Sequence, residues 1–92
     1  MPVHLLLEGL SYQFFVYPSY TVETLLKSVK HLVEVNAPKY ELSGKELQIG
    51  NRSYCFESAD PKLNKQYVDT LASVALQDSV VDANGYRYVS IR

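Results

Sequence analysis

The residues best suited to chemistry are one cysteine and two histidines, Cys55, His4 and His31. A cysteine nucleophile needs an imidazole base beside its thiol. The hydrophobic pattern places His4 and Cys55 on different strands and His31 on the polar side of a helix. A cysteine between Tyr54 and Phe56 in a strand is typical of a small buried hydrophobe. We therefore expect no Cys-His catalysis.

Other chemical patterns are weak as well. The histidines and carboxylates show no HxxE or HExxH spacing, and a single cysteine builds neither a disulfide nor a multi-cysteine zinc site. The glycines are isolated turn residues rather than a phosphate-binding loop: Gly9, Gly44, Gly50 and Gly85. No pair of carboxylates falls in a predicted cleft. We expect a chain that is not an enzyme, with no cofactor, no metal and no small-molecule substrate.

The aromatic residues are more informative. The chain has eight Tyr and three Phe but no Trp. The strand alternation predicts that one face of the sheet carries Leu6, Phe15, Tyr17, Tyr86 and Tyr88, with His4 beside them. An apolar patch on a sheet face must be covered or used. We expect these five residues to bind another protein or a second copy of the chain, because aromatic side chains are enriched at interfaces.

Two other interpretations of the aromatic face remain open. A second helix could cover it through Leu63, Tyr67, Leu71 and Val74. Single-stranded RNA or DNA could stack on the aromatic rings. No Lys or Arg cluster flanks the patch, and nine Lys+Arg against ten Asp+Glu give a net charge of -1. Nucleic acid is therefore the alternative rather than the expected partner, and an acidic membrane surface is not expected.

The elements that must position these residues follow from hydrophobic spacing. We expect a hairpin, a helix of about four turns, three short strands, a second helix and a last strand. The expected strands are Val3–Leu7, Tyr12–Tyr17, Lys39–Leu42, Leu47–Ile49, Arg52–Glu57 and Tyr86–Ile91. The first helix begins after Thr21 and ends at Ala37-Pro38, and the second runs from Asp60-Pro61 to Gln77 or Asp78. The chain is long enough for one domain, residues 1–92.

The strand phase predicts which side chains form the core. Alternation points Val3, Leu5, Tyr12, Phe14 and Val16 of the hairpin inward. These residues would meet the apolar face of the first helix, whose residues recur at spacings of three and four. The sequence therefore predicts a sheet with one helix-covered face.

Two stretches resemble ubiquitin. Residues 16–23, Val-Tyr-Pro-Ser-Tyr-Thr-Val-Glu, resemble the stretch in which the second strand ends at Pro-Ser and a Thr caps the helix. Residues 39–47 are similar to the third strand and its Gly-Lys-x-Leu turn. The resemblance covers residues 1–50 and implies an α+β, ubiquitin-like β-grasp: a mixed sheet packed on an amphipathic helix, here with an additional second helix before the last strand. The rival is another α+β sandwich of two helices on an antiparallel sheet.

The resemblance also limits the function. A conjugated modifier needs a Gly-Gly carboxyl terminus, whereas this sequence ends Val89-Ser90-Ile91-Arg92. Glu41 falls at the position that matches the isoleucine of ubiquitin's recognition patch. We therefore expect a non-catalytic protein-protein interaction module that is not a conjugated modifier. It could form a homodimer, or be a domain of a larger regulatory or viral protein.

The start of the sequence and its cysteine content suggest a compartment. Met1 to Glu8 contain a short apolar run but no basic region and no small-residue cleavage site. One cysteine cannot form an intramolecular disulfide, so a reducing compartment suits the chain. We expect a cytoplasmic protein with no membrane contact.

Overall fold

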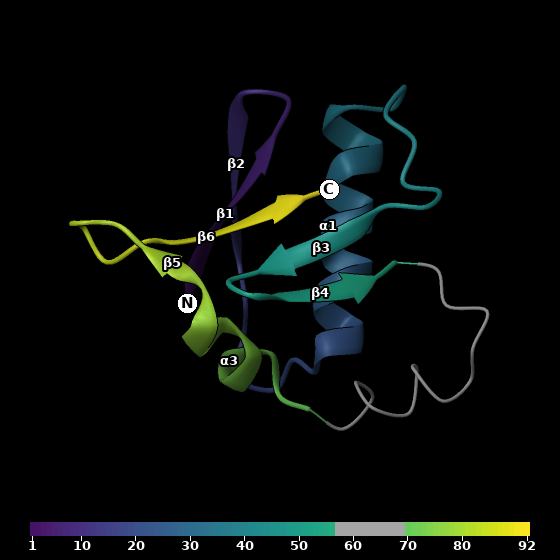
Figure 1. Ribbon diagram of the computed structural model, residues 1–92. Helices are drawn as coiled ribbons and strands as arrows, with labels where there is room; N and C mark the ends of the chain where they lie inside the picture. The colour runs from purple at the N-terminus through teal and green to yellow at the C-terminus, as the bar shows by residue number, and fades with distance from the viewer. Residues whose placement is uncertain (57–69) are drawn as a thin grey trace.

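The computed structural model describes residues 1–56 and 70–92. Within them the chain is α+β: a six-stranded mixed sheet with helices on one face (Figure 1). The strands are β1 (Pro2–Leu7), β2 (Leu10–Phe15), β3 (Glu46–Ile49), β4 (Arg52–Cys55), β5 (Val80–Val81) and β6 (Arg87–Ile91). The helices are α1 (Val22–Asn36), α3 (Ala72–Ala75) and the 3₁₀ turn η1 (Leu76–Asp78) that follows α3.

The sheet places the first and last strands of the sequence side by side. Its order is β2-β1-β6-β3-β4, and β5 pairs with the start of β6. β1 and β6 run parallel, with Val3 opposite Arg87 and Leu5 opposite Val89. The other strand pairs are antiparallel. The chain therefore has a mixed sheet, and the wholly antiparallel sheet of the rival prediction is wrong.

The β1–β2 hairpin turns on Glu8 and Gly9. Both have positive φ, 51° and 80°, which is the backbone of a two-residue turn that matches the twist of the flanking strands. Leu7 and Leu10 close the turn as partners. The predicted amino-terminal hairpin is confirmed.

Helix α1 begins where the sequence predicts. Thr21 is the N-cap, and its Oγ1 accepts a hydrogen bond of 3.3 Å from the N–H of Thr24. The buried face is formed by Val22, Leu25, Val29 and Val33. The helix ends at Asn36, and its C-cap Ala37, just before Pro38, donates its N–H to the carbonyl of Val33 at 2.7 Å.

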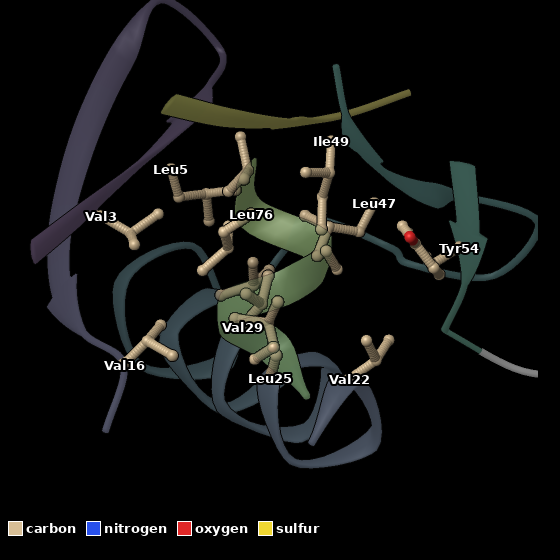
Figure 2. Packing of buried hydrophobic residues seen from close by; sticks show 14 of the residues in the cluster. Val3, Leu5, Val16, Val22, Leu25, Val29, Leu47, Ile49, Tyr54 and Leu76 are labelled. Atoms are coloured by element: carbon tan, nitrogen blue, oxygen red, sulfur yellow. The ribbon is translucent and has the colours of Figure 1, made fainter. Parts of the chain in front are cut away.

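The core lies between the sheet and α1. The labelled side chains of β1, β3 and α1 point toward one another in Figure 2, and Leu76 lies among them. Val3 and Leu5 are fully buried, as predicted, and Tyr12 and Phe14 of β2 pack against the core while partly exposed. The predicted inward phase of the hairpin is confirmed.

The second helix differs from the prediction. Residues 60–69 of the predicted span, with Leu63 and Tyr67, lie outside the described residues. In the described part, Ala72, Ala75 and Leu76 are buried in the same core as α1. The covering role predicted for Leu71 and Val74 is wrong, because both are exposed.

Backbone hydrogen bonds explain why α3 buries Ala72 and leaves Leu71 exposed. Val22 donates to the carbonyl of Thr70 and Ala72 donates to that of Tyr20, at 2.9 and 2.8 Å. These bonds hold the segment before α3 beside the start of α1, and the helix must then bury Ala72 rather than Leu71.

The strand predicted for Lys39–Leu42 is absent. Its place is taken by two turns, in which Tyr40 donates to the carbonyl of Ala37 and Lys45 to that of Leu42, each at 2.9 Å. The strand that pairs with β6 comes later, because Glu46 exchanges backbone hydrogen bonds with Arg92 at 2.8 and 3.0 Å. Strand β5, at Val80–Val81, is a further element that the sequence pattern did not predict.

Candidate functional site

The face of the sheet turned away from α1 is not covered by α1 or α3. We call it the outer face. Alternation places His4, Leu6, Gln13, Phe15, Gln48, Tyr88 and Ser90 on it. Leu6 of β1 and Phe15 of β2 are 44% and 59% exposed, whereas Leu5 and Leu7, which flank Leu6 and point to the opposite face, are buried. The outer face therefore mixes exposed apolar side chains with hydroxyls and amides.

Three aromatic rings cluster on the outer face. The ring centroids of His4 and Tyr86 are 4.9 Å apart in an edge-on contact. Those of His4 and Tyr88 are 5.2 Å apart, and the two residues are register partners across the parallel β1–β6 pair. His4 Nε2 is buried and has no hydrogen-bond partner within residues 1–56 and 70–92. The cluster is thus held by ring packing and by the backbone pairing of β1 with β6.

Asp82 fixes the two tyrosines. Its Oδ1 accepts from the N–H groups of Asn84 and Tyr86 at 2.9 and 3.0 Å, and its Oδ2 accepts from the Tyr88 hydroxyl at 2.9 Å. Burial alone would raise the pKa of Asp82, but these hydrogen bonds outweigh it and lower the pKa. The same carboxylate raises the pKa of Tyr88, first through the hydrogen bond. The β5–β6 turn and the aromatic cluster are therefore one unit.

A hollow of about 410 Å³ opens beside this unit. It lies where β6 changes partners: β5 pairs with Arg87 and Tyr88, and β3 pairs with Ser90 and Ile91. Its walls are Leu6, Gln48, Gly50, Val80, Tyr88, Val89, Ser90 and Arg92. A volume of this size is in the range of pockets that take a small ligand or a large side chain.

The structure brings three of the five predicted site residues together. Leu6 and Tyr88 border the hollow, and Tyr86 joins them through the ring of His4. Phe15 is on the same face but farther along β2, opposite Pro2. Tyr17 is 60% exposed beyond the end of β2, and its ring packs on Tyr20 with centroids 5.5 Å apart.

Sequence reasoning missed several residues of this region, among them Val80 and Asp82. Val80 is 68% exposed and borders the hollow, and Asp82 anchors both tyrosines. A signal for them existed: the β-branched pair Val80-Val81 precedes Asp82 and the Asn84-Gly85 turn, which is a short hairpin pattern.

The thiol and the histidines lie apart. Cys55 is on β4 and His4 on β1, and strands β6 and β3 lie between them. The Sγ of Cys55 is 3.7 Å from Oε1 of Glu46. Burial, and then the charge of Glu46 and its hydrogen bond, raise the pKa of Cys55. A raised pKa disfavours the thiolate, so this geometry does not prepare a nucleophile.

Within residues 1–56 and 70–92, no three His, Cys, Asp or Glu side chains gather in a way that could hold a metal ion. None of the helices in the same ranges has the length and apolar character needed to cross a membrane. Comparison of the chain with family models, curated proteins and solved structures finds no match in any of the three.

Proposed function

We propose that this chain is a non-catalytic protein-binding domain with a ubiquitin-like β-grasp fold. The strand order supports the fold. A β-grasp places its last strand parallel to its first, with the amino-terminal hairpin on one side and the later strands on the other. The order β2-β1-β6-β3-β4, with β1 parallel to β6 and α1 packed on one face, has that arrangement.

The two ubiquitin-resembling stretches differ in their support for this proposal. The Pro18-Ser19-x-Thr21 stretch ends the hairpin and caps α1, as the resemblance implies. The Gly44-Lys45-x-Leu47 stretch fits less well, because the turn precedes the strand that pairs with β6 and residues 39–42 form no strand. For the same reason Glu41, in a loop, presents no sheet-face patch like that of ubiquitin.

The proposed partner is a protein, and one observation carries this proposal: exposed apolar side chains surround the hollow on the outer face. Leu6 and Val80 border it at 44% and 68% exposure, and Tyr88 forms its aromatic wall. Gln48 and Ser90 supply polar groups beside them. An apolar centre with a few polar groups at its margin is the composition of protein interfaces.

Single-stranded nucleic acid is supported less well. The aromatic rings are available for stacking. However, the side chain of Arg87, the cation nearest to them in sequence, makes hydrogen bonds within the protein and is not directed toward a phosphate ligand. Its guanidinium donates to the carbonyl of Leu76 at 2.6 Å and to the hydroxyl of Ser79 at 3.2 Å. Within the described residues, the hollow has Arg92 as its one charged wall residue.

The test is a pull-down from a lysate of the source cells, with and without nuclease, using the wild type and Leu6→Asp or Val80→Asp. We expect a nuclease-resistant protein partner that each variant loses, because the new carboxylate would have to give up its hydration against the apolar residues of the interface. Val35→Asp is the matched control: Val35 is 64% exposed on α1, away from the sheet, and should keep the partner.

Two results would contradict the proposal. Recovery that nuclease abolishes would indicate a nucleic-acid ligand. A partner retained by both outer-face variants, with circular dichroism showing that they fold, would place the binding surface elsewhere.

A further inference from the structure

Within residues 1–56 and 70–92, strand β2 is an unprotected edge of the sheet. It is the terminal strand of the order β2-β1-β6-β3-β4, and none of its residues is fully buried. Its sequence, Leu-Ser-Tyr-Gln-Phe-Phe, contains neither a charge nor a proline. Proteins normally block such an edge with charges, prolines or bulges, because its backbone groups can pair with another strand. The absence of these devices from β2 points to a partner strand.

The hydrogen-bonding phase of this edge is set by its first pair. Val16 and Met1 exchange backbone hydrogen bonds of 2.9 and 3.1 Å. In an antiparallel pair, alternate residues bond inward, so Phe14, Tyr12 and Leu10 bond to β1. Ser11, Gln13 and Phe15 therefore direct their N–H and C=O groups to the open edge.

Two hollows lie on the helix side of this edge. One, of about 420 Å³, is bordered by Phe14 and by α1 residues from Thr24 to Leu32. The other, of about 480 Å³, is bordered by Leu10, Tyr12 and the segment from Asn36 to Tyr40. A strand added to β2 would direct alternate side chains into the space between the sheet and α1.

We propose that β2 pairs antiparallel with β2 of a second copy of this chain, centred on Gln13. In this register Gln13 lies opposite itself, and Ser11 lies opposite Phe15 of the second copy. All three residues that bond outward therefore meet residues that also bond outward, and the ladder is complete on both sides.

The same register fills the two hollows. Tyr12 of the second copy lies beside Phe14, next to the 420 Å³ hollow, and Phe14 of the second copy lies beside Tyr12, next to the 480 Å³ hollow. Aromatic cross-strand pairs of this kind stabilise sheets. The strands bring no like charges together, because β2 contains no charged residue. One segment thus supplies both the ligand and the site, which favours a second copy over another partner.

The first test is the mass of the protein in solution by analytical ultracentrifugation across a concentration series. We expect a shift from the 10.4 kDa chain toward twice that mass. Gln13→Lys places two ammonium groups opposite each other at the two-fold axis and should raise the dissociation constant at least about tenfold, because like charges facing each other across an interface are costly. Ser53→Lys is the control, since Ser53 is an exposed residue of β4, at the other edge of the sheet, and should leave the mass unchanged.

The second test fixes the register. Residues opposite each other in an antiparallel pair lie about 5.5 Å apart at Cα or closer, within the range that a disulfide spans. In a Cys55→Ser background, Gln13→Cys should form a disulfide-linked dimer on oxidation, whereas Ser53→Cys should remain monomeric.

Two results would overturn the proposal: a monomer at every concentration, or a dimer unaffected by Gln13→Lys. In the second case, a dimer that Leu6→Asp dissociates would assign self-association to the hollow on the outer face. Both side chains lie on the outer face, but Leu6 borders the hollow and Gln13 does not, so loss of the lysate partner in Leu6→Asp and loss of the dimer in Gln13→Lys are separate readouts.

Discussion

The two faces of the sheet are made by the same strands but are used in opposite ways. On β1, Val3, Leu5 and Leu7 are buried under α1, while Leu6 between them is 44% exposed. On β6, Val89 is buried and Tyr88 faces the open hollow. Since neighbouring residues share strand, backbone and pairing, the difference comes from what packs on each face. The inner face should carry the stability of the fold, and the outer face should carry its contacts with other molecules.

The largest expected effect on the free energy of unfolding comes from substituting neighbouring residues of β1 that lie on opposite faces of the sheet. Leu5→Ala removes a fully buried side chain and should lower the free energy of unfolding by about 2 to 5 kcal/mol. Leu6→Ala, one residue along and outward, should lower it by less than about 1 kcal/mol. Urea denaturation followed by circular dichroism measures both. Equal losses would mean that the outer face is also a packed core.

Two glycines in turns, Gly50 and Gly44, provide a second matched pair of substitutions. Gly50 has φ +59°, and a Cβ built on it would overlap the carbonyl oxygen of Asp78. Gly44 has φ +73°, but no atom of the described residues lies within 4 Å of its Cβ position. Both Ala variants carry the left-handed backbone strain of about 1 kcal/mol. Gly50→Ala must also move the end of η1, which adds about 1 to 3 kcal/mol.

Thermal denaturation of the two variants decides this point. We expect the melting temperature of Gly50→Ala to fall well below that of Gly44→Ala. If the two variants melted together, the close approach of the β3–β4 turn to Asp78 would not contribute to stability.

The elements with clear periodicity could be predicted from the sequence. The hairpin alternates over six residues in each strand, and α1 repeats its apolar residues over fifteen. The cap by Thr21 was predictable because it depends on local chemistry alone. For these elements, local preference and tertiary packing agree.

The shorter elements are harder to predict from hydrophobic periodicity, for a physical reason. β5 has two residues, too few to show a period, and residues 39–42 alternate like a strand but find no partner strand in the described fold. The phase of α3 depends on the backbone bonds of Thr70 and Ala72 to the start of α1, which no local pattern encodes. The candidate site shows the same division. Leu6 and Tyr88 follow from strand alternation, and Val80 follows only from the local hairpin pattern around Asn84-Gly85, whereas the position of Tyr17 depends on where β2 ends.

A smaller effect concerns α1, the helix that covers the inner face. Thr21→Ala removes the oxygen that accepts from the N–H of Thr24 and should lower the free energy of unfolding by about 1 kcal/mol. Thr24→Ala is the control, because its hydroxyl lies near Thr21 Oγ1 but the backbone cap remains. That variant should be as stable as the wild type or slightly more so, since Ala favours helix. Urea midpoints of the two variants provide the measurement, and a larger loss in Thr24→Ala would contradict this account of the cap.

The smallest expected effect on stability is a pH dependence on the outer face. Hydrogen bonds lower the pKa of Asp82 in the folded protein despite its burial. A lowered folded pKa gives stability that is complete above the unfolded value of about 3.9 and is lost as the pH falls through the folded pKa. Tyr88 has the opposite sign: its raised pKa gives stability that is complete below about 10 and is lost as the pH rises through the folded pKa.

The directions of these two pKa shifts predict that the Asp82–Tyr88 contact stabilises the fold most between about pH 3.9 and about pH 10. Tyr88→Phe removes one of the three hydrogen bonds to the carboxylate, so the pKa of Asp82 should move up toward its usual value in an NMR titration of the side-chain carboxyl. Glu41→Gln, in the loop before β3, is the control and should leave that titration unchanged. An Asp82 pKa that Tyr88→Phe does not move would mean that the N–H groups of Asn84 and Tyr86 alone hold the carboxylate, and that the aromatic cluster is positioned by ring packing on His4 instead.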